Sequence, residues 1–196
     1  MNMQKLQRQD LYSLEKYAEV RSEFRDEVMR HKRDRRLMLG TNATLYFEDR
    51  MTMQYQVQEM LRIERIFEAA GIDDELAAYN PLIPDGNNWK ATFMVEFAEE
   101  GERRAMLREL VGIEDSVWIQ IGDGEKIRPI ADEDLERDDE SKTSAVHFLR
   151  FELAPDDIGR LKDGAQLAAG IDHRNYQVEV RPVPDNVRRA LLADLD

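Results

Sequence analysis

The sequence contains no cysteine among its 196 residues. A chain without thiols cannot form disulfides, ligate zinc or an iron–sulfur cluster through sulfur, or use a cysteine nucleophile. It also lacks any apolar run close to the roughly 18 residues that a membrane-spanning helix needs. The opening residues, MNMQKLQRQD, hold no apolar signal-peptide core, so we expect a cytoplasmic location and no membrane association.

Four well-known catalytic and nucleotide-binding motifs are absent as well. The sequence has no Walker A loop, no GxGxxG fingerprint, no HExxH pair and no GxSxG elbow. Gly122 and Gly124 lie in a predicted hairpin turn and not between a strand and a helix, which disfavours phosphate binding there. The mechanisms that these motifs support therefore have no basis in this chain.

Charge is distributed unevenly along the chain. The net charge is −13, yet the first 40 residues hold ten Lys or Arg against seven Asp or Glu and are positive. The basic run 30–36 could neutralise nucleic-acid phosphates, but a strongly acidic chain repels polyanions at long range. We therefore predict no nucleic-acid partner. The run is better explained as a solvated helix face that pairs with the acidic segment 131–140, or as a docking patch for an acidic protein.

The N-terminal part is predicted to be mainly helical. Two helices are expected over 11–17 and 22–38, with Asp10 and Ser22 as their N-caps. A third and stronger helix is expected over 50–70, followed by a C-cap glycine. Its apolar stripe consists of Met53, Val57, Met60, Leu61 and Phe67.

Glu64 interrupts the apolar stripe of this third helix. A carboxylate in that position must be paired, hydrogen-bonded, protonated or bound to a metal. The alternatives are an ion pair with Arg35, a stripe edge that reaches water, and a metal or catalytic role. His31 lies on the apolar side of its own helix and can meet Glu64, with Glu59 or Glu48 as a third metal ligand.

The residues after 71 follow the two-residue period of β-strands. Strands are predicted over 91–97, 117–121, 126–130, 145–153, 165–171 and 177–183. Shorter helices are predicted over 102–111, 155–162 and 184–195. Helices first and strands afterwards indicate one α+β domain over 1–196. Its helical part (1–71) is expected to pack on a mainly antiparallel sheet of about five to six strands (72–196) with a C-terminal helix.

Two histidines of the β part are candidate functional groups. Alternation places His147 on the apolar face of its strand, as a hydrogen-bonded core histidine or as a ligand or general base at the mouth of the sheet. The nearby carboxylates Glu96 and Glu152 lie on the other faces of their own strands, where they are better placed to pair with Arg150. His173 follows a strand in a polar loop, either as a functional group or as an exposed side chain beside the turn residue Asp172.

Several stretches of the sequence stand out together. They are 31–33 (HKR), 39–40 (LG), 42–50 (NATLYFEDR), 58–62 (QEMLR) with Glu64, 79–86 (YNPLIPDG), 89–92 (WKAT), 142–148 (KTSAVHF) and 150–152 (RFE). Over most of the chain they resemble an uncharacterised bacterial family, domain-of-unknown-function family 3501. The resemblance implies a context and no activity, because such genes often lie beside those of a rubrerythrin-like protein and a Cys-rich iron–sulfur oxidoreductase.

The resemblance also includes polar residues that folding does not obviously require. They are Glu48, Arg50, Gln58, Glu59, Arg62 and Glu64. The candidate ligand-binding residues are Glu48, Arg50, Glu59, Arg62, Glu64, His147 and His173. His31, Glu64 and His147 are the candidate metal ligands. The cofactor stays open, except that this chain holds no iron–sulfur cluster of its own.

Two functions are predicted on these grounds. The first is a cytoplasmic accessory or binding protein of a rubrerythrin-like and iron–sulfur oxidoreductase redox system, active in oxidative stress through protein contact and a small ligand or metal. The alternative is a metal-binding protein or small-molecule enzyme that uses a buried Glu/His site. The sequence indicates no particular oligomeric state.

Overall fold

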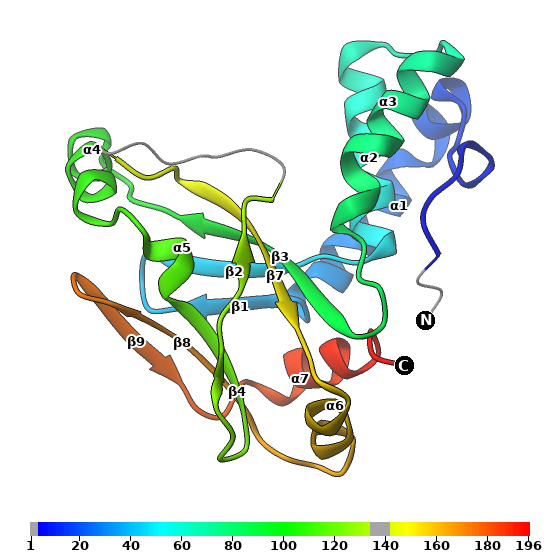
Figure 1. The fold of residues 1–196 in the computed structure, drawn as a ribbon. Helices are drawn as coiled ribbons and strands as arrows, with labels where there is room; N and C mark the ends of the chain where they lie inside the picture. Colours follow the sequence, from blue (N-terminus) through cyan, green and yellow to red (C-terminus); the bar gives the residue numbers. More distant parts are fainter. Residues whose placement is uncertain (1–3, 134–141) are drawn as a thin grey trace.

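The computed structural model describes residues 4–133 and 142–196, which form helices and two antiparallel sheets (Figure 1). The helices in order are η1 (Arg8–Asp10), α1 (Leu14–Arg33), α2 (Arg50–Glu64), α3 (Ala69–Tyr79), η2 (Asn80–Leu82), α4 (Glu100–Glu109), α5 (Ile113–Ser116), α6 (Pro155–Lys162) and α7 (Asp185–Leu192). The strands are β1 (Arg36–Leu39), β2 (Ala43–Phe47), β3 (Asn88–Val95), β4 (Val117–Ile121), β5 (Lys126–Ile127), β6 (Ile130–Ala131), β7 (Val146–Glu152), β8 (Leu167–His173) and β9 (Tyr176–Val180). The predicted α+β class, antiparallel pairing and C-terminal helix are confirmed.

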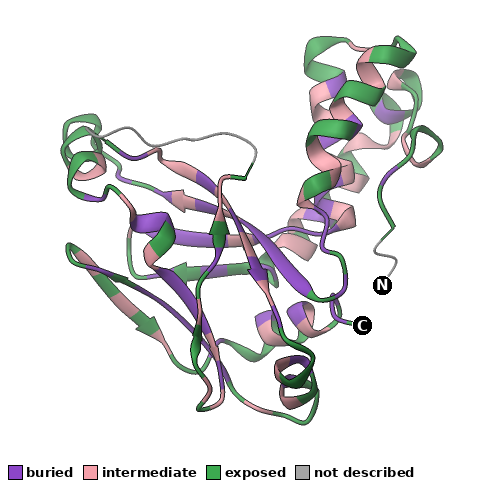
Figure 2. Cartoon of the chain, viewed as in Figure 1, coloured by how far each residue is buried: buried purple, intermediate pink, exposed green. Residues whose placement is uncertain are grey.

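Two sheets share one apolar core. In the described part of the chain, β1, β2, β3, β7 and β6 form a five-stranded sheet, and β5, β4, β8 and β9 form a four-stranded one. The inner faces contribute Phe93 and Leu149 from the first sheet and Ile119 and Ile171 from the second. Figure 2 shows buried residues running along both sheets. The strands thus form two sheets around this core, where a single sheet of five to six strands was predicted.

Helices α1, α2 and α3, which we call the helical lobe, stand beside the five-stranded sheet (Figure 1). The lobe has an apolar cluster of its own. Its buried members are Leu6, Met53, Val57, Leu61, Leu76 and Ile83. Because this cluster is separate from the core between the sheets, the lobe and the sheets meet across a boundary where a cavity can form.

The first helix and strand differ from the prediction. The helix α1 is capped by Ser13 and not by Asp10, and it continues without a break through the predicted second N-cap. Residues 36–39, of which 36–38 were predicted to be helical, form β1, because Leu37 and Leu39 alternate with exposed neighbours and pair with β2. Gly40, with φ of 77°, makes the turn of this hairpin and does not end a helix.

The end of the third predicted helix is also different. α2 stops at Glu64, because Arg65 adopts the left-handed conformation with φ of 58°. The chain then begins α3, which contains Gly71 in its first turn and continues through residues 72–79, for which no helix was predicted. Phe67 lies between the two helices and is 74% exposed, so it is not part of an apolar stripe.

Candidate functional site

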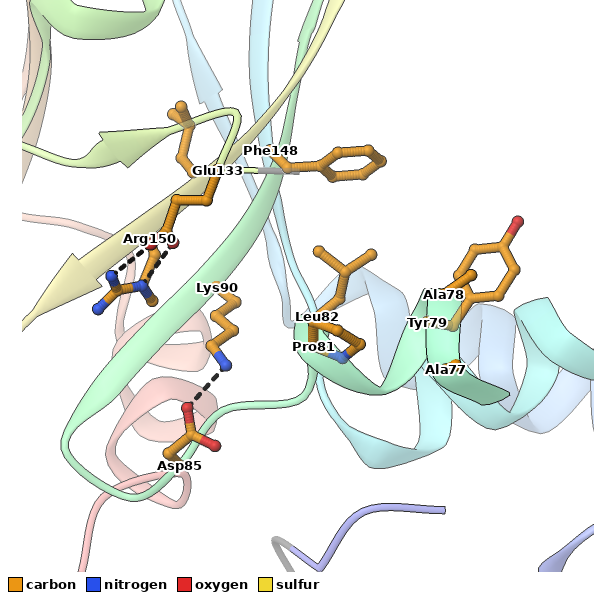
Figure 3. A pocket seen from close by; sticks show the side chains of 11 residues that line it. Ala77, Ala78, Tyr79, Pro81, Leu82, Asp85, Lys90, Glu133, Phe148 and Arg150 are labelled. Atoms are coloured by element: carbon orange, nitrogen blue, oxygen red, sulfur yellow. Dashed lines mark hydrogen bonds and ion pairs between the residues drawn. The ribbon is translucent and has the colours of Figure 1, made fainter. Parts of the chain in front are cut away.

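A cavity of about 850 Å³ lies between the helical lobe and the five-stranded sheet (Figure 3). Its apolar wall is formed by Ala77, Ala78, Tyr79, Pro81, Leu82, Phe148 and Leu149. Its polar lining residues are Asp85, Lys90, Glu133 and Arg150. A largely apolar hollow with a few convergent polar groups is typical of small-molecule sites in proteins.

The alternation of β3 and β7 places Lys90, Phe148 and Arg150 on the outer face of the sheet, whereas the side chain of Leu149 belongs to the core. Ala91 and Phe151 belong to the core between the sheets. Their sequence neighbours Lys90 and Arg150 therefore point to the opposite face, as does Phe148. The helical lobe shelters this face, which leaves Lys90 buried although it is charged.

Lys90 and Arg150 are direct cross-strand partners in the pairing of β3 with β7. Two cations in such a position repel each other unless carboxylates neutralise them. Here Asp85 Oδ2 accepts a hydrogen bond from Lys90 Nζ at 2.7 Å, and Glu133 binds the Arg150 guanidinium. The sheet therefore keeps two cations side by side at one end of an apolar cavity.

The guanidinium of Arg150 is held by carboxylates on two sides. Its Nε and Nη2 each donate to a different oxygen of Glu133 at 2.7 Å, and its Nη1 contacts Glu152. These hydrogen bonds raise the pKa of Arg150, and Arg150 in turn lowers the pKa of Glu133. The carboxylate of Glu133 is half exposed, so water reaches this ion pair.

Asp85 binds two lysines at once. Its Oδ1 accepts from Lys5 Nζ at 2.7 Å while its Oδ2 accepts from Lys90. Burial by itself would raise the pKa of Asp85, but the two lysines outweigh it and hold that pKa well below the usual range. For Lys90 burial is the largest influence and lowers the pKa, with Lys5 and Arg150 adding to it against the opposing effect of Asp85.

Sequence reasoning did not identify this cavity. Its α3 wall, residues 77–79, lies where no helix was predicted, and Lys90 lies just before the predicted strand 91–97. Two signals could have indicated it. The stretches 79–86, 89–92 and 150–152, which carry the family resemblance, supply six of the lining residues. A lysine on the outer face of a strand that also holds a tryptophan is a second signal.

Glu59 and Arg62, two of the predicted site residues, lie together on the helical lobe. Glu59 Oε1 accepts hydrogen bonds from the hydroxyl of Tyr17 and from Arg21 Nε, each at 2.7 Å. Arg62 adds a longer contact of 3.3 Å from the same helix. Arg21 is the main cause that lowers the pKa of Glu59, to about 2. This cluster joins α1 to α2 and has a structural role.

His31 meets a carboxylate other than Glu64. Its Nε2 lies 2.5 Å from Asp49 Oδ2, and Arg35 Nε lies 2.9 Å from the same oxygen. Arg35 also donates to Asp194 near the end of the chain, with Nη1 2.8 Å from Oδ2. Burial raises the pKa of Asp194, whereas at Asp49 the partners His31 and Arg35 outweigh burial and lower the pKa. Of the alternatives given for Glu64, the ion pair with Arg35 is therefore wrong, and the position that reaches water is the one that the structure shows.

His147 is a fully buried, hydrogen-bonded histidine of the core. Its Nδ1 lies 2.6 Å from Asp132 Oδ2, and its Nε2 lies 2.9 Å from Thr143 Oγ1. Glu114 stands 3.8 Å from the same Nε2. Both ring nitrogens therefore have hydrogen-bond partners, which is the hydrogen-bonded core histidine of the two alternatives given for His147.

His173 is buried, not exposed in a loop. Its Nε2 lies 3.1 Å from the carbonyl oxygen of Val111, to which it donates, and its Nδ1 accepts from the backbone N–H of Asn175. Both ring nitrogens are thus used by the backbone. Asp172 points to the outer face instead, where it accepts from Trp118 Nε1 at 2.9 Å.

The other predicted site residues are dispersed. Glu48 accepts from Thr92, Arg50 pairs with Asp10, and Glu64 is exposed at the end of α2. The basic run 30–36 is divided, because Arg35 is buried; most of its predicted acidic partner segment lies outside the described residues.

The candidate metal ligands do not form one site. His31, Glu64 and His147 belong to α1, the end of α2 and β7, and each has different surroundings. Within residues 4–133 and 142–196, no group of three His, Cys, Asp or Glu is placed to hold a metal ion. No helix in that part of the chain is long and apolar enough to cross a membrane.

Taken together, the fold and the cavity define an α+β protein with a small-molecule-sized site between a helical lobe and a sheet. The chain belongs to the DUF3501 family, described as a protein of unknown function, whose profile matches residues 5–195. A crystal structure of a protein of unknown function from Burkholderia pseudomallei K96243 is similar, with 48% sequence identity and a TM-score of 0.94. The match covers 98% of this chain and 100% of that one. A search of curated proteins found no significant match.

Proposed function

We propose that this chain is an accessory protein that binds a small organic anion with an apolar body in the cavity beside Lys90 and Arg150. The observation that carries the proposal is the cavity itself, of about 850 Å³, with an apolar wall and two cations at one end. Ligand pockets in proteins are commonly of about this size and are mostly apolar with a few polar groups that fix orientation.

The bonding of Arg150 supports a carboxylate as the head group. A guanidinium presents a planar fork that binds a carboxylate through two parallel hydrogen bonds. Glu133 already binds Arg150 in this way, with both N–O distances at 2.7 Å. Because Glu133 is half exposed, a ligand carboxylate can take its place on the same fork, with the apolar body against Tyr79 and Phe148.

Decanoate is a suitable probe for this site. We expect isothermal titration calorimetry to detect decanoate binding to the wild type, and no comparable binding of decyltrimethylammonium, which has the same chain with a cationic head. Arg150→Met should weaken decanoate binding by about 10- to 100-fold, because a hydrogen bond to a charged group contributes about 1.5–3 kcal/mol.

Arg104→Met is the matched control, because Arg104 is an exposed residue of α4 paired only within its own helix to Glu100. It should bind decanoate as the wild type does. Equal binding of the two detergents, or equal affinities in Arg150→Met and Arg104→Met, would contradict the anion site. Circular dichroism of each variant shows whether the fold is kept.

We further propose that the protein works in the cytoplasm beside a rubrerythrin-like protein and an iron–sulfur oxidoreductase. Membership of the DUF3501 family supports this, through the gene context that the resemblance implies. The absence of cysteine supports it as well, since any iron–sulfur chemistry must then take place on a partner chain. The ligand site would give this chain a role in such a system that needs no metal of its own.

A native pull-down tests this second proposal. With this chain as bait in cells that express all three genes, we expect both redox proteins to be enriched over a mock bait of equal net charge. The reciprocal experiment with the rubrerythrin-like protein as bait should recover this chain. Recovery of neither protein in both directions would remove the partner proposal and leave the cavity proposal standing.

A further inference from the structure

Two lysines share one carboxylate and one carbonyl group at the polar end of the cavity. Lys5 Nζ lies 2.7 Å from Asp85 Oδ1 and 2.8 Å from the carbonyl oxygen of Ile83. Lys90 Nζ lies 2.7 Å from Asp85 Oδ2 and 2.9 Å from the same carbonyl oxygen. The two amines are therefore neighbours, although they are far apart in the sequence.

This arrangement has more cations than the shared carboxylate can neutralise. Asp85 offsets the charge of only one of the two lysines, while Arg150, directly across the strand pair from Lys90, is paired with Glu133 and Glu152. The side chain of Lys90 is only 9% exposed, whereas that of Lys5 is 42% exposed. Burial and neighbouring cations both favour a neutral amine, so Lys90 is the lysine of the pair that gives up its proton more readily.

The hydrogen bonds of Lys90 also suit a neutral amine. Such an amine has two N–H donors and one lone pair. Its two acceptors, Asp85 Oδ2 and the carbonyl oxygen of Ile83, use both donors. The lone pair is then free to act as a nucleophile, and Asp85 is in place to accept a proton from the same nitrogen.

We propose that Lys90 forms an imine with a carbonyl compound that enters the cavity, namely a 2-oxo acid with an apolar chain. This inference rests on the proposed function in that both use the same cavity. The carboxylate of the oxo acid binds the Arg150 fork, which lies across the strand pair from Lys90. The apolar chain lies along the wall formed by Tyr79, Leu82 and Phe148.

The reaction needs no oxidant or cofactor. The Nζ lone pair forms a bond to the carbonyl carbon, and the electrons of the C=O π bond move to oxygen. Asp85 carries a proton from Nζ to this oxygen, which gives a carbinolamine. Asp85 then takes the second Nζ proton as the C=N bond forms, and that proton leaves with the hydroxyl group as water.

Reductive trapping tests this proposal with 2-oxooctanoate as the probe. We treat the wild type with 2-oxooctanoate and sodium cyanoborohydride at pH 7 and map the modified lysines by peptide mass spectrometry. Lys90 should be modified several times faster than the exposed Lys16 of α1, because burial and the neighbouring cations lower the pKa of Lys90. Modification of Lys5 before Lys90, or equal rates at all lysines, would overturn the proposal.

Lys5→Met separates the role of the lysine pair from simple accessibility. Without Lys5, Asp85 neutralises Lys90 alone, so Lys90 keeps its proton more firmly. The rate of Lys90 modification at pH 7 should fall about three- to tenfold, because removing a neighbouring cation raises the pKa of Lys90 and leaves less of it as the neutral amine. An unchanged rate at pH 7 would show that Lys5 has no such effect and would contradict the lysine-pair argument.

Decanoate, which has no reactive carbonyl, makes the two proposals distinguishable. Decanoate binding without a Lys90 adduct removes the imine and leaves the anion site. A Lys90 adduct without decanoate binding removes the anion site as proposed and keeps the reactive lysine. If neither is observed, both proposals are wrong.

Discussion

Replacing Arg35 with methionine is expected to lower the free energy of unfolding by about 3–5 kcal/mol, the usual loss when one partner of a buried ion pair is removed. Arg35 is 1% exposed and binds two buried carboxylates, Asp49 and Asp194. Methionine fills a similar volume but leaves both carboxylates without their guanidinium. Urea unfolding at pH 7, followed by circular dichroism, measures the difference.

Arg36→Met is the matched control for this prediction. Arg36 is the next residue, is exposed, and lies over the ring of Tyr46 at 5.7 Å. Its loss should cost less than about 1 kcal/mol, as for exposed cation–π contacts. Adding Asp194→Asn to Arg35→Met should recover part of the stability, because a buried amide needs no countercharge. If Arg35→Met and Arg36→Met lowered the free energy of unfolding equally, the buried ion pairs of Arg35 would not be what stabilises the fold there.

The cluster of His31, Arg35, Asp49 and Asp194, which we call the Arg35 cluster, also bears on domain organisation. It joins the end of α1, the N-cap of α2 at Asp49 and the C-terminal residues near α7. Since these belong to the helical lobe and to the sheet core, we expect both parts to unfold in a single transition. Far-UV circular dichroism, which follows the helices, should coincide with the fluorescence of Trp89 and Trp118 in the sheets.

The inward and outward faces of β3 and β7 could be predicted from the sequence. In both strands every second residue is buried, such as the apolar Phe93 in β3 and Leu149 and Phe151 in β7, and this fixes the face that each residue takes. The structure pairs Phe93 with His147, and His147 lies on the core face as expected. The predicted contact between Arg150 and Glu152 is also present.

The division of the strands between two sheets could not be predicted in the same way. Alternation indicates which face of a strand is buried, but it carries no information about which sheet the strand joins. The strands β5 and β6 have two residues each, too few to show any period. The hairpin of β4 with β5 was predicted and is present, but the pairing of β6 with β7 depends on tertiary contacts that a sequence pattern does not contain.

Glu64 shows why the predicted site was misplaced. Its position in an apolar stripe assumed a helix that continues to residue 70. The left-handed conformation of Arg65 ends α2 at Glu64, so the carboxylate faces solvent and its neighbour Phe67 is exposed. Helical periodicity cannot reveal such an end when the residue that makes the turn is an arginine and not a glycine.

The cavity could not be predicted because its lining comes from four separate segments. Tyr79 and Leu82 lie on the lobe, Lys90 and Arg150 on two strands, and Glu133 in a loop. Each is unremarkable in its own segment, and only the packing of the lobe against the sheet brings them together. The sequence showed the polar face of each strand, but not that the lobe covers it.

Replacing Glu59 with glutamine is the second large effect that we expect, and it depends on pH. Arg21, with Tyr17 and Arg62, lowers the pKa of Glu59 from its ordinary value of 4.5 to about 2. A carboxylate with a lowered folded-state pKa stabilises the fold at pH values above its unfolded pKa, and this stabilisation is lost as the pH falls towards the folded value. The side chain is only 13% exposed, so the contribution at pH 7 is about 2–3 kcal/mol.

Glutamine has no charge to lose, so the stability gap between wild type and Glu59→Gln should narrow between pH 5 and pH 3, to roughly half its neutral value. Urea unfolding at several pH values measures this gap. Glu64→Gln is the control. Because Glu64 is an exposed residue of the same helix, its replacement should lower the free energy of unfolding by less than about 0.5 kcal/mol at every pH. A gap for Glu59→Gln that does not change with pH would mean that its ion pair with Arg21 is not what stabilises the contact between α1 and α2.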